Sequence, residues 1–149
     1  MKRLPNKTLL LAIFLNSVWI VKAQTNGLEY VKSEIMKLTD IEINAFRAGD
    51  CKTMGDLIDD NATFYLDGKK APSKEMIIGF CSRVQRPFEK PSKVTSDFFP
   101  TSNNSAYVVR IMEFTKDGKL YKKEIVTKVW VKGKEGWKIS HLHSTIKVL

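Results

Sequence analysis

Histidine and cysteine are scarce in this 149-residue chain, which holds only two of each. The cysteines, Cys51 and Cys81, form no CxxC motif, so the sequence predicts neither a zinc site nor a dithiol redox site. Two interpretations of this pair remain open, one disulfide or two small buried side chains. The histidines, His141 and His143, have no third histidine to complete a ligand set, and no metal is predicted.

The sequence also lacks the motifs of nucleotide-binding and nucleic-acid-binding proteins. It contains no phosphate-binding loop and no glycine-rich dinucleotide motif, so no cofactor is predicted. Basic residues are frequent between Lys116 and Lys134, but they alternate with acidic residues, as on a solvated strand face. Because aromatic residues do not accompany them in the pattern of a nucleic-acid module, no nucleic-acid partner is expected.

Long apolar runs are absent except near the N-terminus. Basic residues precede the apolar segment Thr8 to Val21, and the small residues of Val21-Lys22-Ala23 suit a signal peptidase. The sequence therefore predicts a secretory signal peptide at 1–23, a mature domain at 24–149, and a secreted or periplasmic location. The apolar segment is short for a membrane span of about 20 residues, so no stable membrane insertion is expected after cleavage. Loss of the leader lowers the formal net charge from +9 to +5.

The first half of the mature chain predicts helices and little strand. Apolar residues at three- and four-residue spacing indicate a helix at 28–48 that ends at Gly49. Asp50 is placed to cap a second, short helix that continues to about Ile58. A turn at 59–61, a short strand at 62–66, a turn at 67–68 and a third helix at 72–84 are expected to follow.

The second half predicts an antiparallel meander with strands at 93–99, 105–115, 120–132 and 136–148. Asp117-Gly118 is typical of a two-residue type I′ hairpin, and the segment 132–136 is expected to form a five-residue loop. Helices first and a meander afterwards predict one α+β domain with helices on one face of the sheet.

Five short motifs occur in order between residues 28 and 146. They are Ala48-Gly49-Asp50, Ser82-Arg83, Arg110-Ile111, Val129-Trp130 and Trp137-x-Ile139-x-His141-x-His143. This combination resembles the nuclear transport factor 2-like (SnoaL-like) superfamily, and within it the association (hub) domain of calcium/calmodulin-dependent protein kinase II and its stand-alone bacterial relatives. The resemblance implies a cone-shaped fold, in which N-terminal helices pack on a strongly bent, mostly antiparallel sheet around a pocket. It also implies a homodimer or a larger homo-oligomer formed through the sheet.

The resemblance implies ligand-binding residues as well, because arginines in the hub pocket can hold a small carboxylate. Arg83 and Arg110 match two of these arginines by position. Ser144 stands where the hub domains have an arginine directly after the H-x-H motif, so one bidentate guanidinium is missing.

Strand register gives a separate prediction of which residues meet. With Asp117-Gly118 as the turn, Arg110 faces Ile125, and with a five-residue second loop Ile125 faces His143. These three residues would then form one row on the face that carries His141. A four-residue loop would move both histidines to the opposite face.

Several polar side chains are therefore candidate site residues. Arg110 lies in an apolar strand and is costly to bury alone, so it either binds an anion in the pocket or forms an internal salt bridge. His143 and His141 are candidates for acid/base catalysis, or for hydrogen-bonded positions in a pocket or interface. Tyr65 and Tyr107 are candidates for the pocket mouth.

Together these features predict an exported, homo-oligomeric domain that binds a small anionic or polar-aromatic molecule without a cofactor. One alternative is an isomerase, cyclase or dehydratase in which a pocket histidine acts beside Arg110. A second alternative is an oligomerisation module with a vestigial pocket. The sequence favours binding over catalysis, because the carboxylate base and oxyanion pair of a ketosteroid-type isomerase cannot be located in it.

Overall fold

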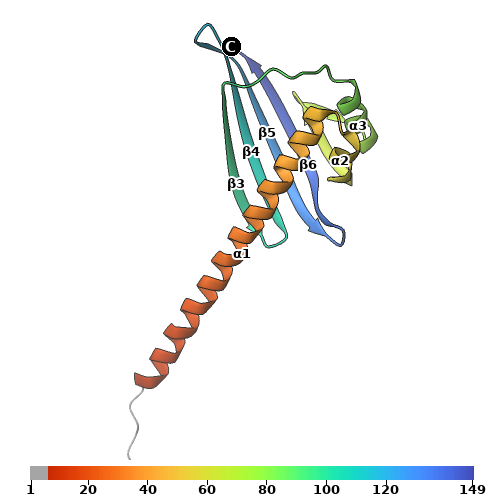
Figure 1. Ribbon diagram of the computed structural model, residues 1–149. Helices are drawn as coiled ribbons and strands as arrows, with labels where there is room; N and C mark the ends of the chain where they lie inside the picture. Colours follow the sequence, from red (N-terminus) through yellow and green to blue (C-terminus); the bar gives the residue numbers. More distant parts are fainter. Residues whose placement is uncertain (1–6) are drawn as a thin grey trace, which may run out of the picture.

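The computed structural model describes the backbone of residues 7–149 and the side chains of residues 27–149. Within these residues, six strands form one sheet in the order β2-β1-β6-β5-β4-β3, and three helices lie on one side of it (Figure 1). The elements are α1 (Lys7–Ala48), α2 (Cys51–Asp56), β1 (Ile58–Leu66), β2 (Lys69–Ala71), α3 (Lys74–Arg83), β3 (Lys93–Ser102), β4 (Ser105–Lys116), β5 (Lys119–Gly133) and β6 (Gly136–Val148). Neighbouring strands are antiparallel except for the parallel pair β1 and β6.

The α+β class, the helices on one face and the mostly antiparallel sheet are confirmed. The sheet is open, and β2 and β3 form its two edges. The four strands of the meander begin and end within three residues of the predicted bounds. The turn at Asp117-Gly118 is confirmed too, because both residues have the positive φ angles, 52° and 75°, that a type I′ turn requires.

Three local predictions were wrong. Helix α1 begins at Lys7 rather than at residue 28, because the segment 7–26 contains no proline or glycine that would interrupt it. The segment 59–61 belongs to β1 instead of a turn, and an irregularity in its pairing with β6 absorbs these polar residues. The short strand β2 was not predicted, since its sequence, Lys-Lys-Ala, carries no strand signal.

The predicted signal peptide lies wholly outside the residues whose side chains are described. Its first six residues are not described at all, and the backbone of the remainder continues into α1 (Figure 1). In the described part of the chain, no helix has a stretch long and apolar enough to cross a membrane. Cleavage after Ala23 stays a prediction.

The core lies between α1 and the inner face of the sheet. Val31, Ile35 and Ala45 are buried on one side of α1, and Trp130 is completely buried on β5 opposite them. The helix stops at Gly49, whose φ of 79° lies in the left-handed region, and Asp50 then accepts a hydrogen bond from the Thr53 amide to start α2. The chain therefore turns at Gly49 and Asp50, which places α2 beside the C-terminal end of α1.

One disulfide and one set of hydrogen bonds hold α3 against the other helices. A disulfide joins Cys51 at the start of α2 to Cys81 in α3, which decides between the two interpretations left open by the sequence. The guanidinium of Arg86 donates hydrogen bonds to the carbonyls of Phe46, Arg47, Cys81 and Val84 at 2.7–3.3 Å. This arginine therefore satisfies carbonyls at the ends of α1 and α3 together.

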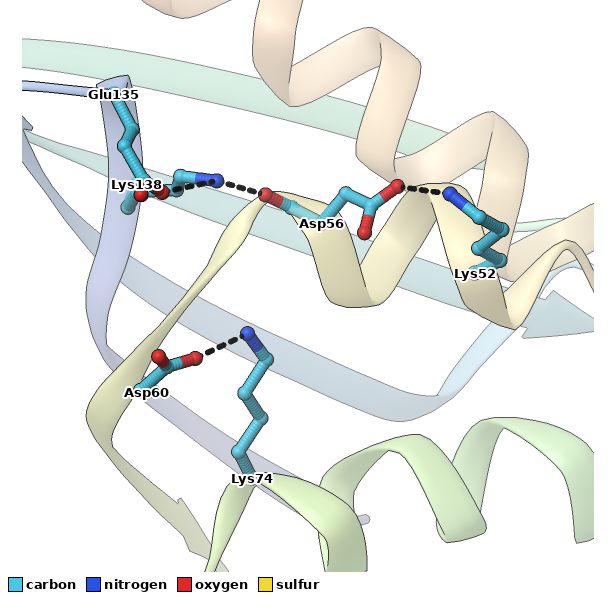
Figure 2. Close-up of polar contacts among 6 residues, drawn as sticks. All are labelled: Lys52, Asp56, Asp60, Lys74, Glu135 and Lys138. Carbon is cyan, nitrogen blue, oxygen red and sulfur yellow. Dashed lines mark hydrogen bonds and ion pairs between the residues drawn. The ribbon is translucent and has the colours of Figure 1, made fainter.

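An ion pair and a hydrogen bond at the surface connect α3 to β1 and α2 to β6 (Figure 2). Lys74 at the start of α3 pairs with Asp60 of β1 at 2.8 Å, and Lys52 pairs with Asp56 within α2 at 2.8 Å. Lys138 of β6 donates to the backbone carbonyl of Asp56 at 2.5 Å. Such exposed pairs contribute little to stability, because water and salt screen their charges.

Candidate binding cavity

A cavity of about 340 Å³ lies between the helices and the inner face of the sheet. All three helices and the strands β1, β4, β5 and β6 contribute lining residues. Most of these residues are apolar, and five of them are phenylalanines: Phe46, Phe64, Phe80, Phe88 and Phe114. A mostly apolar cavity with a few polar groups is the usual form of a small-molecule site.

Two extra residues in β5 and β6 determine which side chains face this cavity. Next to the hairpin turn, Lys116 pairs with Lys119 as predicted, but the extra residue Tyr121 then shifts the register by one. Arg110 consequently pairs with Val126 and not with Ile125.

A second shift reverses the faces of β6. The loop predicted at 132–136 is shorter than expected, because Gly133 pairs with Gly136, and the extra residue Ser140 lies between the pairs Trp130–Ile139 and Val129–His141. The predicted row of Arg110, Ile125 and His143 was therefore wrong. The observed row is Arg110, Val126 and Ser144, and all three residues line the cavity.

Both histidines lie on the sheet face away from the cavity. A hydrogen bond of 2.7 Å joins the hydroxyl of Thr63 and Nδ1 of His141, and the ring of Tyr65 lies 6.0 Å from His141 and 6.2 Å from His143. None of these four residues lines the cavity. A catalytic role for the histidines stays a prediction, but the structure gives it no place in this cavity.

Tyr107 also lies outside the cavity lining, although it was a candidate for the pocket mouth. Its ring stacks on Phe99 of β3 with 4.7 Å between the ring centroids. Because Tyr107 alternates with Ala106 and Val108, which are buried under the helices, it belongs to the outer face of the sheet.

Arg110 is the predicted site residue that the structure does place in the cavity. Its guanidinium is partly buried, and it makes no hydrogen bond or ion pair with any residue from 27 to 149. Desolvation by the apolar walls, and secondarily the positive charge of Arg47, lowers the pKa of Arg110, although an arginine remains protonated at neutral pH. The internal salt bridge considered as an alternative role is absent among the described residues.

The two lysines that line the cavity are paired, unlike Arg110. Lys128 and Glu42 form an ion pair in which both residues are more than 90% buried. Lys122 pairs with Glu89 at 2.5 Å, and its Nζ also lies 3.8 Å from the centre of the Phe114 ring. Both lysine charges are therefore neutralised by carboxylates within the wall.

Arg83, the second arginine expected from the resemblance, does not line the cavity. It is exposed at the end of α3 and lies over Gly79 of the same helix. The second arginine of the cavity is Arg47, in the last turn of α1. Sequence reasoning missed Arg47 because a basic residue near a helix C-terminus is common for local reasons.

Among residues 27–149, no group of three or more histidine, cysteine, aspartate or glutamate side chains could hold a metal ion. The cavity lining combines apolar side chains with the guanidinium groups of Arg110 and Arg47, which can donate hydrogen bonds to an anion.

No model of a known protein family matches the chain, and no curated protein matches it. Solved structures do match. A nuclear transport factor 2-like protein from Silicibacter pomeroyi DSS-3 has a TM-score of 0.63 at 12% identity, covering 80% of this chain and 98% of that one. The association domain of C. elegans CaMKII has a TM-score of 0.58 at 18% identity, covering 78% and 95%. A ketosteroid isomerase-like protein from Erwinia carotovora atroseptica has a TM-score of 0.57 at 17% identity, covering 77% and 95%.

These structures share one architecture although their sequences differ widely from that of this chain. Identities below 20% carry the arrangement of helices and strands but no ligand or reaction. The resemblance suggested by the sequence motifs is confirmed at this level: the chain has the nuclear transport factor 2-like fold, with helices over one face of a mostly antiparallel sheet.

Proposed function

We propose that the chain is an exported small-molecule-binding domain whose cavity holds a small organic anion through Arg110. The observation that carries this proposal is a guanidinium in an apolar wall with no partner among the described residues. Leaving a charged group without a partner in such a place is costly, so a protein gains stability when an anion binds it. A carboxylate fits this role because its two oxygens match the fork of the guanidinium.

The enzyme alternative has less support than binding. An isomerase, cyclase or dehydratase that used His141 or His143 would need one of these side chains within reach of the bound molecule. Both histidines face the other side of the sheet, so neither side chain is placed to act on a molecule bound in this cavity.

Calorimetric titration with 4-phenylbutyrate tests the binding proposal. We expect the wild-type protein to bind this carboxylate and the variant Arg110→Gln to bind it about 50-fold more weakly, because hydrogen bonds to charged groups contribute about 1.5–3 kcal/mol. The matched control is Arg83→Gln, which removes an exposed arginine outside the cavity and should leave Kd unchanged. Equal binding by the wild-type protein and Arg110→Gln would contradict the proposal.

Homo-oligomer formation through the outer face of the sheet is a second part of the proposal. This face carries Phe99, Ile125 and Val131, which are each about 40% exposed, together with Val109 and Ile111. Exposed apolar surface of this kind commonly marks a protein interface. One of the similar structures is an association domain, which is in keeping with assembly.

Light scattering after size exclusion tests this part. We expect the wild-type protein to have at least twice the mass of the monomer and Ile125→Lys to shift toward the monomer, because a lysine would bury a charge in the interface. Met76→Lys is the control, since Met76 is 48% exposed but lies on α3. A monomeric wild-type protein would refute assembly without affecting the binding proposal.

Export is proposed from the leader and is supported by the disulfide between Cys51 and Cys81. Disulfides persist in secreted and periplasmic proteins and are rare in the reducing cytosol. Identification of the N-terminal residue of the protein recovered from its natural host tests the expected cleavage after Ala23.

A further inference from the structure

We propose that Arg47 and Arg110 together form a two-arginine clamp, and that the molecule they hold is an amphipathic monocarboxylate with its apolar body inside the cavity. This inference rests on the proposed binding function and specifies its second anchor and its ligand class. The sequence motifs did not indicate Arg47, and the resemblance assigned the second position to Arg83.

The position of Arg47 makes its side chain available to a ligand. Basic residues in the last turn of a helix usually interact with the unpaired carbonyls of that helix. Here Arg86 already donates hydrogen bonds to the carbonyls of Phe46 and Arg47. The guanidinium of Arg47 lines the cavity and makes no ion pair with residues 27–149.

The two arginines face one cavity from opposite walls, with Arg47 on α1 and Arg110 on β4. No carboxylate bridges them among the described residues. The positive charge of Arg47 lowers the pKa of Arg110, and the charges of Glu42, Glu124 and Asp40 oppose this effect without forming an ion pair with Arg110. An anion between the two side chains would make an attractive contact with each arginine in place of their repulsion. Because Arg47 is exposed and Arg110 is only partly buried, we expect this anion at the rim of the cavity, where the cavity meets solvent.

The charges of the lining indicate an anion with a single charge. Glu42 is neutralised by Lys128, and Glu89 is neutralised by Lys122. The remaining carboxylate, Glu124, accepts a hydrogen bond from the Ser144 hydroxyl at 3.1 Å and has no lysine or arginine within ion-pair distance among the described residues. With two free arginines and one free glutamate, the lining has one positive charge in excess, which a monocarboxylate would neutralise.

The apolar walls indicate what the rest of the molecule is like. Below the rim the cavity is lined by Met54, Ile58, Phe64 and Ile77, each less than a tenth exposed. The volume of about 340 Å³ is near the lower limit for small-molecule sites, which suits one ring with a short chain. With the carboxylate at the rim, the apolar part of the molecule would displace water from these apolar side chains.

The test uses calorimetric titration of the full mature protein with three probes. They are 4-phenylbutyrate, its neutral analogue 4-phenylbutanamide, and acetate, which has the charge but no apolar body. We expect the amide and acetate each to bind at least tenfold more weakly than 4-phenylbutyrate. We also expect Arg47→Gln to weaken 4-phenylbutyrate at least tenfold, Arg47→Lys to weaken it less, and Arg83→Gln to have no effect. Arg47 is exposed, so unchanged thermal unfolding should show that these variants fold.

Each contrary result has a distinct meaning. If Arg110→Gln weakens binding and Arg47→Gln does not, the clamp is refuted while the anion site of the proposed function remains. If the amide binds as tightly as the acid, or if the wild-type protein does not bind 4-phenylbutyrate, the ligand class is refuted. If neither arginine affects the binding of the acid, the clamp and the proposed function both fail.

Discussion

Replacing Glu42 by alanine should lower the free energy of unfolding by about 3–5 kcal/mol, the largest effect expected for a single side chain here. Glu42 and Lys128 are 5% and 7% exposed, and they form an ion pair between α1 and β5. Removal of the glutamate would leave the lysine ammonium buried without its partner, which costs more than the pair contributes. Urea denaturation followed by circular dichroism measures the change.

Two further variants separate the lost pair from a general effect of mutation. The double variant Glu42→Leu with Lys128→Met replaces both charges by apolar side chains and should recover most of the lost stability. Lys52→Ala removes one partner of the exposed pair in α2 and should lower the free energy of unfolding far less, because solvent screens an exposed pair. If Glu42→Ala costs no more than Lys52→Ala, the buried pair does not hold α1 against the sheet as described.

Removing the disulfide should lower the free energy of unfolding by about 3–4 kcal/mol. The two cysteines are 30 residues apart, and closing a loop of that length restricts the unfolded chain by about this amount in the chain-entropy account. Denaturation of a Cys51→Ala, Cys81→Ala double variant under non-reducing conditions measures the loss. The effect should be largest in α3, which the disulfide joins to α2, so faster amide exchange is expected there.

The reducing agent supplies the control for this experiment. It should lower the stability of the wild-type protein to that of the double variant and leave the double variant unchanged. A wild-type protein that is equally stable with and without reductant would indicate that the disulfide contributes nothing to holding α3 over the cavity.

Much of the fold could be predicted because the signals are local. Asp117-Gly118 specifies its hairpin through backbone conformation alone, and Gly49 followed by Asp50 marks the end of one helix and the start of the next. The order of helices and strands then follows from these breaks. The start of strand β1 was misplaced, because Ile58 pairs with Ile139 far along the chain and the polar residues between Ile58 and Thr63 fit into an irregular stretch of that pairing.

The site was harder to predict, because one residue of register decides which face each side chain occupies. Tyr121 and Ser140 are the extra residues in β5 and β6, and neither has a sequence signal that marks an irregular pairing. Without Tyr121 as an extra residue, Arg110 would pair with Ile125 as predicted. Without Ser140 as an extra residue, His141 and His143 would lie on the same face of the sheet as Ile139. Ser140 therefore explains why the motif Trp137-x-Ile139 faces the core while His141 faces outward.

Glu42 illustrates a signal that was present but easily overlooked. It lies on the apolar stripe of α1 between Leu38 and Ala45, where a carboxylate indicates a buried partner. Lys128 has the same character in the apolar sequence of β5. Matching the two required the tertiary structure, since they are far apart in the sequence and only the packing of α1 on the sheet brings them together.

A crystal structure of the protein with 4-phenylbutyrate would show directly whether the cavity holds an anion at Arg110. We expect the carboxylate within about 3 Å of the Arg110 guanidinium, at hydrogen-bond distance, and the phenyl ring among the apolar side chains of the cavity. A carboxylate bound on the outer face beside His141 and His143, or a cavity that stays empty while Arg110 turns away from it, would show that Arg110 is not the anion-binding residue.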